Sequence, residues 1–143
     1  KEQWNQVDGP IHDFEEKCYF HEMRPDADGF VTCAVVNDGF GRGEGFGVYV
    51  RYHQANLPRF TQWKQTGEQD YVIGLEPCNC GVGGRDIDSE LGLLHTIQPG
   101  EEKTYRLAFG AVTTSEKVAA LRTACGQANP TIVDDYREFV AKP

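Results

Sequence analysis

Glu76 is the side chain in this sequence that best suits proton-transfer chemistry. It follows the apolar run Tyr71–Leu75, which indicates a strand, so we expect its carboxylate at a strand end, partly shielded from water. Partial loss of water raises the pKa of a carboxyl group towards neutral pH, which suits a general base. Pro77 lacks a backbone N–H and is expected to end the strand, holding the carboxylate at the loop boundary.

A purely structural role is the competing interpretation of the same carboxylate. Lys64 and Arg85 are the nearest basic residues before and after Glu76, and either could form an ordinary ion pair with it. Taken by itself, the pattern of residues favours this structural role.

Cys78 and Cys80 form a Cys-x-Cys pair that could take part in a metal site, with Cys33 or His95 as further ligands. One such pair is weak support, because structural zinc needs four ligands and usually shows two spaced pairs. We therefore expect no metal. The glycine-rich run Gly81–Arg85 lacks the Gly-Lys-Ser/Thr ending of a phosphate loop, and we expect no amphipathic helix after it.

The segments that would position these residues are mostly typical of β-strands, because apolar and polar residues alternate or β-branched and aromatic residues cluster. Turns rich in Gly, Pro, Asn and Asp separate them, which favours a sandwich or barrel over alternating strands and helices. We predict an all-β fold, a mostly antiparallel β-sandwich in which residues 1–143 form a single domain or the C-terminal part of one. The strand candidates, of which the first and fifth are weaker, are Glu15–His21, Phe30–Asn37, Gly45–His53, Asp70–Glu76, Leu91–Ile97 and Lys103–Val112.

The sequence changes character near Thr114. Ser115–Cys125 combines helix formers with an apolar stripe, and Gly126 is suited to stop a helix. Asn129 followed by Pro130 is suited to begin a second helix. We therefore predict one or two C-terminal helices, with residues 114–143 as a helical tail of the same domain. The apolar face of the second helix would consist of Ile132, Tyr136, Phe139 and Val140.

Composition and charge exclude several classes of partner. The net charge of −8 and the absence of a Lys/Arg run argue against nucleic acid, whose phosphates would be repelled. No apolar stretch approaches the roughly 18 residues of a membrane span, so we expect no membrane partner. The five cysteines are odd in number and not spaced as a disulfide framework, so reduced thiols and a cytoplasmic location are the simpler expectation.

The segment Leu57–Arg85 (LPRFTQWKQTGEQDYVIGLEPCNCGVGGR) and the turn Gln98–Glu101 (QPGE) carry a resemblance. Together they are similar to the C-terminal part of aldose 1-epimerases, in the galactose mutarotase-like superfamily, where a Leu-Glu-Pro strand precedes a Pro-Gly-Glu turn and another strand. An uncharacterised branch resembles this chain more closely. Its members carry a segment with Glu, an aromatic residue and His in this order, like Glu16–His21, an Asn at a strand end like Asn37, and Leu-Pro-x-x-x-x-Trp-Lys like Leu57–Lys64. The resemblance covers roughly Asp8 to Val112.

The resemblance implies a protein that interconverts sugar anomers or epimers by acid–base catalysis, without a metal or cofactor. Glu76 falls where the family places its catalytic base. The family's catalytic histidines lie in the upstream half of the sandwich, which this chain lacks, so a missing N-terminal half or a partner would supply the acid. Cys78 replaces a family Gln, so Asn79 is the candidate for that sugar contact. His21 matches a family segment and could face the cleft, although a non-catalytic histidine with satisfied hydrogen bonds is the simpler interpretation.

Three more residues near Glu76 are candidate sugar contacts. Trp63 could provide a flat apolar face on which a sugar ring stacks, and plain core packing is its alternative. Lys64 and Arg85 could donate hydrogen bonds to sugar hydroxyls or to the carboxylate of an acidic sugar. Surface ion pairs, including one with Glu76, are their alternative.

Three functions fit these observations. The first is an aldose 1-epimerase-like isomerase with Glu76 as base, once the sandwich is complete. The second is a non-catalytic carbohydrate-binding module. The third is an interaction subunit of a sugar-processing complex, whose open sheet edge another chain completes. We expect a sugar ligand, and either a homo-oligomer or a second polypeptide that completes the sandwich.

Overall fold

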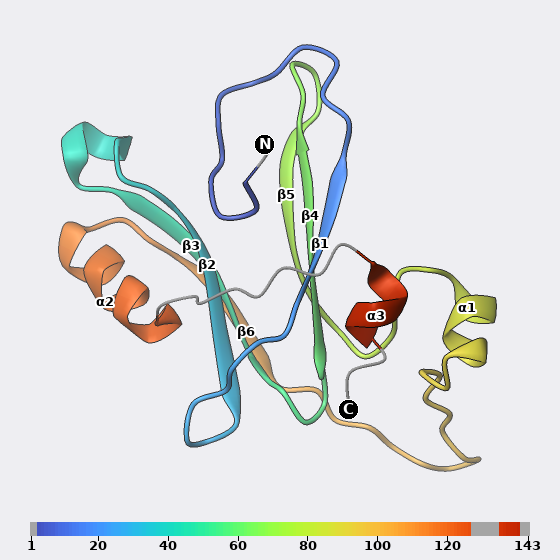
Figure 1. Cartoon of the computed structure of the whole chain (residues 1–143). Coiled ribbons are helices and arrows are strands. Elements are labelled where there is room, and N and C mark those ends of the chain that lie inside the picture. The colour runs from blue at the N-terminus through green and yellow to red at the C-terminus, as the bar shows by residue number, and fades with distance from the viewer. Residues whose placement is uncertain (1–2, 127–134, 141–143) are drawn as a thin grey trace.

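The structure, a computed structural model, describes residues 3–126 and 135–140. These residues form two three-stranded antiparallel sheets that pack face to face at one end (Figure 1). The 1-4-5 sheet consists of β1 (Lys17–His21), β4 (Arg59–Thr66) and β5 (Tyr71–Cys78), with β4 in the middle. The 2-3-6 sheet consists of β2 (Phe30–Asn37), β3 (Phe46–His53) and β6 (Leu107–Val112), with β3 in the middle. The predicted antiparallel β-sandwich is confirmed.

Helical segments are few and short. A 3₁₀ turn, η1 (Phe40–Gly43), lies between β2 and β3, and α1 (Arg85–Glu90) follows the glycine-rich loop after β5. α1 is 6 residues long and the one residue that it buries is Asp88, so it does not contradict the expectation that no amphipathic helix follows this loop. The two C-terminal helices are α2 (Ser115–Cys125) and α3 (Tyr136–Val140). No helix among the described residues is long and apolar enough to cross a membrane.

Most strand predictions were confirmed, and the differences have physical reasons. Leu91–Ile97 forms no strand, and Lys103–Val112 is a strand only from Leu107. The sequence pattern missed β4, because the inward-facing positions at one end of this strand are polar rather than apolar. Polar residues in buried positions erase the alternation by which a half-buried strand is recognised.

Pro77 does not end its strand, contrary to the prediction. β5 continues to Cys78, and Pro77 lies opposite Phe60 in the register with β4. β5 is an edge strand of its sheet, where a missing N–H can face outwards at no cost to the ladder. Glu76 therefore lies within the strand and not at a boundary with the loop.

The core lies at the end of the sandwich where the start of β4 faces the start of β2 and the end of β3. Val31, Val50 and Tyr52 of the 2-3-6 sheet pack against Phe60 of the 1-4-5 sheet. The rings of Tyr52 and Phe60 stack with their centroids 6.0 Å apart. Burial of these side chains joins the two sheets, at about 1.5–3 kcal/mol for each fully buried large apolar side chain.

At its other end, the inner face of the 1-4-5 sheet is polar and is covered by the N-terminal segment. The Lys64 side chain is completely buried, and its Nζ donates to the carbonyl oxygens of Gln3 at 3.2 Å and Gln6 at 2.6 Å. Gln62 Nε2 donates to the carbonyl of Trp4 at 2.8 Å. In Figure 1 this segment lies beside the sheet, on the side of the 2-3-6 sheet. Main-chain carbonyls thus satisfy polar groups that would otherwise be costly to bury.

α2 covers the outer face of the 2-3-6 sheet. The hydroxyl of Thr114 accepts from the Lys117 N–H at 3.4 Å to cap the helix, and Gly126 stops it with a φ of 66°. A Cβ on Gly47 would lie 3.1 Å from the side chain of Leu121, so β3 needs this glycine to let the helix approach. The predicted first helix is confirmed. Asn129, Pro130 and Ile132, on which the start of the second was predicted, lie outside the described residues.

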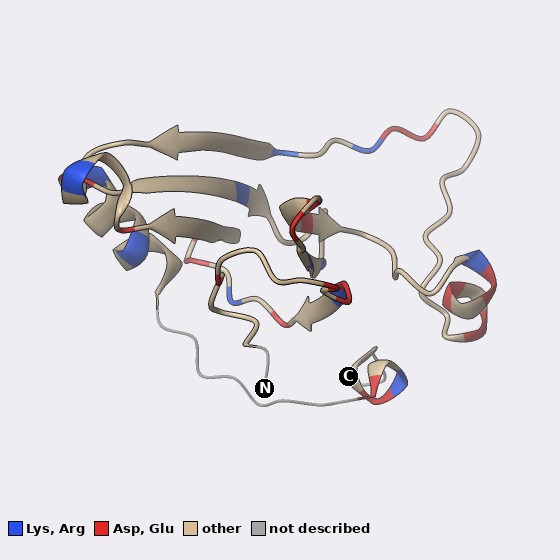
Figure 2. Ribbon diagram, turned by 90° about the horizontal axis from the view of Figure 1, so that it is seen from above, with Lys and Arg blue, Asp and Glu red and all other residues tan. Residues whose placement is uncertain are grey.

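The inner face of the 2-3-6 sheet is only partly covered. Leu107 and Phe109 lie opposite Tyr52 and Val50 in the register, and therefore on the core side. Yet Phe109 is 82% exposed, Leu107 52% and Val48 40%. We call Val48, Leu107 and Phe109 the β6 patch. Figure 2 shows β6 as an outermost strand of its sheet, reached by the long connection after α1.

The contact between α2 and Gly47 gives a stability prediction. Gly47→Val places methyl groups against Leu121 and Val112, and it should lower the free energy of unfolding by about 1–3 kcal/mol, as overpacking usually does. Gly9→Val is the matched control, because a Cβ there meets nothing within 4 Å. Urea denaturation measures both. Equal stability of the two variants would contradict the role assigned to Gly47.

Candidate functional site

The register of the 1-4-5 sheet places Glu76 on its outer face, away from the core. Phe20, Thr61 and Glu76 form one cross-strand row, and Cys18, Trp63 and Gly74 form the next. Side chains in register across antiparallel strands share a face and have Cβ atoms about 4.5–5.5 Å apart. The outer face therefore brings together Glu76 and Trp63, two of the residues singled out in the sequence.

Glu76 is exposed, and among the described residues it forms no hydrogen bond and no ion pair. Its Oε1 occupies the space where a Cβ on Gly74 would lie, beside the Cβ of Trp63. A side chain at position 74 would thus displace the carboxylate. The shielding from water that we predicted is absent within this chain, because nothing described covers this part of the face.

Trp63 lies between two carboxylates on the outer face. Its indole Nε1 donates to Glu16 Oε2 at 2.9 Å, which fixes the orientation of the ring. Burial raises the pKa of the neighbouring Cys18 thiol, and the charges of Glu16 and then Glu76 raise it further. Both carboxylates therefore lie near Cys18. A flat ring flanked by hydrogen-bond acceptors can pack against the C–H face of a sugar and accept hydrogen bonds from its hydroxyls.

Lys64 and His21 belong to the inner face by their register, although His21 is also one of the residues that line the cavity described below. Lys64 is sealed on the inner face, so the structure places it neither in contact with a ligand of the outer face nor in an ion pair with Glu76. His21 Nε2 lies 3.0 Å from Gln62 Oε1, and its ring packs edge-on against Trp4 and Phe60. Burial lowers the pKa of His21 below the usual 6.5, against the opposing effect of the Gln62 contact. His21 is thus a packed, hydrogen-bonded histidine of the inner face.

Asn79 and Arg85 follow β5. Asn79 Nδ2 donates to the hydroxyl of Tyr105 at 2.8 Å, which ties the loop to the segment before β6. Arg85 is exposed as the first residue of α1. Neither forms a hydrogen bond or ion pair with Glu76 among the described residues. The structure does not gather these two residues with Glu76 and Trp63.

A cavity of about 380 Å³ opens on the outer face, next to the Glu76 row. Thr61, directly opposite Glu76 in the register, is one of its lining residues, whereas Glu76 itself does not line the cavity and its Oε1 lies over Gly74. The volume falls within the roughly 300–1,000 Å³ of small-molecule sites. Its lining residues are Phe20, His21, Glu22, Pro58, Arg59, Phe60, Thr61, Cys80, Gly81, Tyr136, Phe139 and Val140.

Sequence reasoning missed this cavity for two reasons. Thr61 and Arg59 belong to β4, whose strand character was not recognised, and their side of the strand could not be assigned. Tyr136 and Phe139 were predicted to lie on the apolar face of a helix, but the sequence did not show which strand this face packs against. Their rings pack on Phe20, with centroid distances of 4.6 and 6.1 Å, so α3 forms one wall of the cavity.

The cysteines show no arrangement suited to a metal. Within residues 3–126 and 135–140, no group of three or more His, Cys, Asp or Glu side chains could hold an ion. Burial raises the pKa of Cys33 to about 12 and also raises that of Cys78. Both thiols are therefore protonated at neutral pH, the form that binds metals least well.

Comparison with known families shows to which family the chain belongs. The family described as Domain of unknown function (DUF4432) matches residues 1–111. The chain belongs to the DUF4432 family. The match ends within β6, so α2 and α3 lie beyond it. No curated protein matches this chain significantly.

A solved structure supports the resemblance to aldose 1-epimerases. The crystal structure of a "putative aldose 1-epimerase" from Klebsiella pneumoniae subsp. pneumoniae MGH 78578 is similar to this DUF4432 chain, with a TM-score of 0.78 and 27% sequence identity. The similarity covers 85% of this chain and 31% of the Klebsiella protein. The chain thus spans about a third of the length of that relative. The resemblance to aldose 1-epimerases that the sequence motifs indicated is confirmed.

The environment of His21 predicts how stability depends on pH. The unfolded chain takes up a proton at His21 near pH 6.5, whereas the folded chain does so only at lower pH. The free energy of unfolding should therefore fall as the pH drops below 6.5. His21→Gln should make this fall shallower, while His95→Gln, the same change on an exposed segment, should not. Urea denaturation between about pH 7 and pH 5 tests this, and equal slopes for all three proteins would contradict it.

Proposed function

We propose that this chain is the part of a carbohydrate-active, aldose 1-epimerase-like protein that carries the general base, Glu76. One observation carries the proposal. Glu76 lies beside Trp63 and directly opposite Thr61, which lines a cavity of about 380 Å³, and its carboxylate forms no hydrogen bond or ion pair with any described residue. The likeness to the Klebsiella protein supports the choice of sugar chemistry.

The proposed reaction needs only proton transfers. Glu76 removes the proton from the anomeric hydroxyl, the bond between the anomeric carbon and the ring oxygen breaks, and the ring oxygen receives a proton from a general acid. The anomeric oxygen becomes a carbonyl. Rotation of this carbonyl and the reverse sequence of steps close the ring on the other face. Trp63 holds the sugar ring during these steps, and no electrons are exchanged with any cofactor.

The general acid and the missing shielding would come from further strands of the same sandwich. This chain corresponds to only 31% of the Klebsiella protein, and the β6 patch leaves the inner face of the 2-3-6 sheet open. Strands that cover this face would extend the sandwich, and other parts of the longer protein could pass over the outer face of the 1-4-5 sheet and bring a histidine or another acid towards Glu76. Exclusion of water around the carboxylate would then favour its action as a base.

A carbohydrate-binding module without catalysis is the second candidate. The exposure of Glu76 favours it, since an exposed carboxylate can accept hydrogen bonds from sugar hydroxyls but is poorly tuned as a base. In this case the outer face would bind a sugar equally well, and no anomer exchange would follow.

Replacing Glu76 tests the catalytic proposal. In the native full-length protein or assembly, Glu76→Gln should lower the rate of anomer exchange by ~10²–10⁴-fold, the usual worth of a positioned base. Sugar affinity should change much less, because an amide oxygen still accepts a hydrogen bond from a hydroxyl. Polarimetry or NMR exchange on candidate aldoses measures the rate.

Glu102→Gln is the matched control, since Glu102 is exposed and lies before β6, away from the outer face. Unchanged exchange in Glu76→Gln would remove this residue from the mechanism. Absence of exchange in the unmutated assembly, together with sugar binding, would leave the binding module as the function.

The β6 patch predicts self-association of the chain when no further strands cover it. Phe109→Glu should shift the chain towards monomer, because a charge replaces the most exposed large apolar side chain of an open sheet face. Phe40→Glu is the matched control, since Phe40 is 55% exposed on η1, outside the patch. Analytical ultracentrifugation over a range of concentrations measures this. A monomeric wild-type chain at high concentration would contradict the prediction.

A further inference from the structure

Arg59 lies at the start of β4, and its side chain shares the outer face with Thr61 and Glu76. It lines the cavity, yet its guanidinium forms no hydrogen bond and no ion pair with any described residue. Its Nε is buried and has no hydrogen-bond partner within residues 3–126 and 135–140. Its positive charge acts to lower the pKa values of Tyr136 and Cys78, against the stronger effect of burial, so the guanidinium lies near both side chains.

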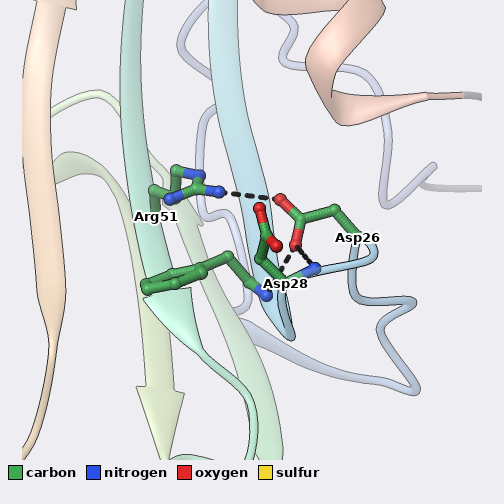
Figure 3. A network of polar contacts seen from close by, with 4 residues as sticks. Asp26, Asp28 and Arg51 are labelled. Carbon is green, nitrogen blue, oxygen red and sulfur yellow. Dashed lines mark hydrogen bonds and ion pairs between the residues drawn. The ribbon is translucent and has the colours of Figure 1, made fainter.

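Two other arginines, Arg51 and Arg122, each pair with an aspartate. Arg51 Nη2 donates to Asp26 Oδ2 at 2.7 Å, while the other carboxylate oxygen of Asp26 accepts backbone N–H groups (Figure 3). Arg122 donates to both oxygens of Asp38 at 2.7 Å. Compared with these two, Arg59 is a charged group in a cavity with no counter-charge in contact among the described residues.

A ligand that fills the cavity must take water away from Arg59. A neutral ligand would leave a dehydrated cation whose only compensation is hydrogen bonding to hydroxyls, which is unfavourable. A carboxylate would instead accept charge-assisted hydrogen bonds from the guanidinium, in the planar, two-pronged geometry that arginine favours. The unpaired guanidinium therefore selects for an anionic group.

The other lining residues indicate what accompanies this anion. Phe20, Phe139 and Val140 offer apolar surface for the C–H groups of a sugar ring, and the Thr61 hydroxyl is available to a sugar hydroxyl. Its contact with Cys78 Sγ, at 3.9 Å, is long and weak. The cavity volume of about 380 Å³ is near the lower limit of ligand sites, so a single sugar ring suits it better than an oligosaccharide.

We infer that this site takes a sugar acid, an aldose that carries one carboxylate, and that Arg59 binds the carboxylate while the anomeric centre lies towards Glu76. The inference rests on the proposed function and names its substrate class. Arg59 is then the residue that determines specificity, and it has no part in the proton transfers.

The charges around Arg59 favour a carboxylate over a phosphate. Glu22 also lines the cavity, and the buried Asp88 lies behind Gly81, whose N–H donates to Asp88 Oδ2 at 2.8 Å. Two carboxylates nearby repel a doubly charged phosphate more than a singly charged carboxylate. The net charge of −8 on the chain acts mostly from greater distances, where salt screens it beyond about 8 Å at physiological ionic strength.

Binding to the chain itself tests the inference without any need for catalysis. Glucuronate, galacturonate, glucose, galactose and glucose 6-phosphate are titrated separately, and affinity is followed by NMR. We expect the two uronates to bind at least ~10-fold more tightly than the neutral sugars, the smallest effect that one charge-assisted pair should give. Glucose 6-phosphate should bind more weakly than the uronates, and added salt should weaken uronate binding.

Arg59→Gln should remove the preference for uronates and leave affinity for neutral sugars nearly unchanged. Arg59→Lys keeps the charge without the planar geometry and should retain part of the preference. Arg106→Gln, on an exposed residue before β6, is the matched control and should behave as wild type. Circular dichroism checks that each variant is folded. If a variant does not fold, the ligand titrations of the wild-type chain still test the inference.

The outcomes separate this inference from the proposed function. Equal binding of uronates and neutral sugars, tighter binding of the phosphate, or no binding of any sugar would each overturn the inference. So would a preference for uronates that survives Arg59→Gln. Anomer exchange of neutral aldoses that depends on Glu76 but not on Arg59 would overturn the inference while the proposed function stands.

Discussion

Lys64, buried with its ammonium group against main-chain carbonyls, sets the direction in which β4 faces. Successive side chains of a strand point to opposite faces, so a strand that turns Gln62 and Lys64 inwards must turn Thr61 and Trp63 outwards. The carbonyls of Gln3 and Gln6 make this burial tolerable by accepting hydrogen bonds from Nζ. Because β4 pairs with both β1 and β5, its orientation also decides that Phe20 and Glu76 lie on the outer face.

The inner faces of the two sheets are packed at one end of the sandwich and exposed at β6. Where Phe60 meets Val50 and Tyr52, the sandwich has a packed core, whereas at β6 the same inner face continues into exposed Leu107 and Phe109. An apolar sheet face costs free energy in water in proportion to its area. The same incompleteness is found at the candidate site, where Glu76 has its neighbours Trp63 and Thr61 but no cover from water. Both observations fit a chain that spans about a third of its solved relative.

The cavity combines a part shared with the DUF4432 family and a part beyond the family match. Phe20, Arg59 and Thr61 come from strands within residues 1–111, whereas Tyr136 and Phe139 come from α3. The rings of α3 pack on Phe20, and Arg137 of the same helix lies 3.5 Å from Glu90 of α1. The strands that line the cavity thus fall within the family match, while α3, which forms one of its walls, lies beyond it.

The sequence by itself determined the sandwich, because the alternation in β3, the β-branched and aromatic runs of β2 and β5, and the turn residues between them are readable without long-range contacts. It also determined α2, through its stop at Gly126, and the relationship to aldose 1-epimerases, through short motifs around Glu76. Only the tertiary structure decided which candidate residues meet. Trp63 and Lys64 are neighbours in sequence, but Trp63 lies on the outer face and Lys64 on the inner face. The inner face was identified only by the N-terminal carbonyls that approach it. Arg59 and Tyr136 could not be associated from sequence at all. They are brought together by β4, an unrecognised strand with polar buried positions, and by a helix that packs on a strand more than a hundred residues earlier, on Phe20.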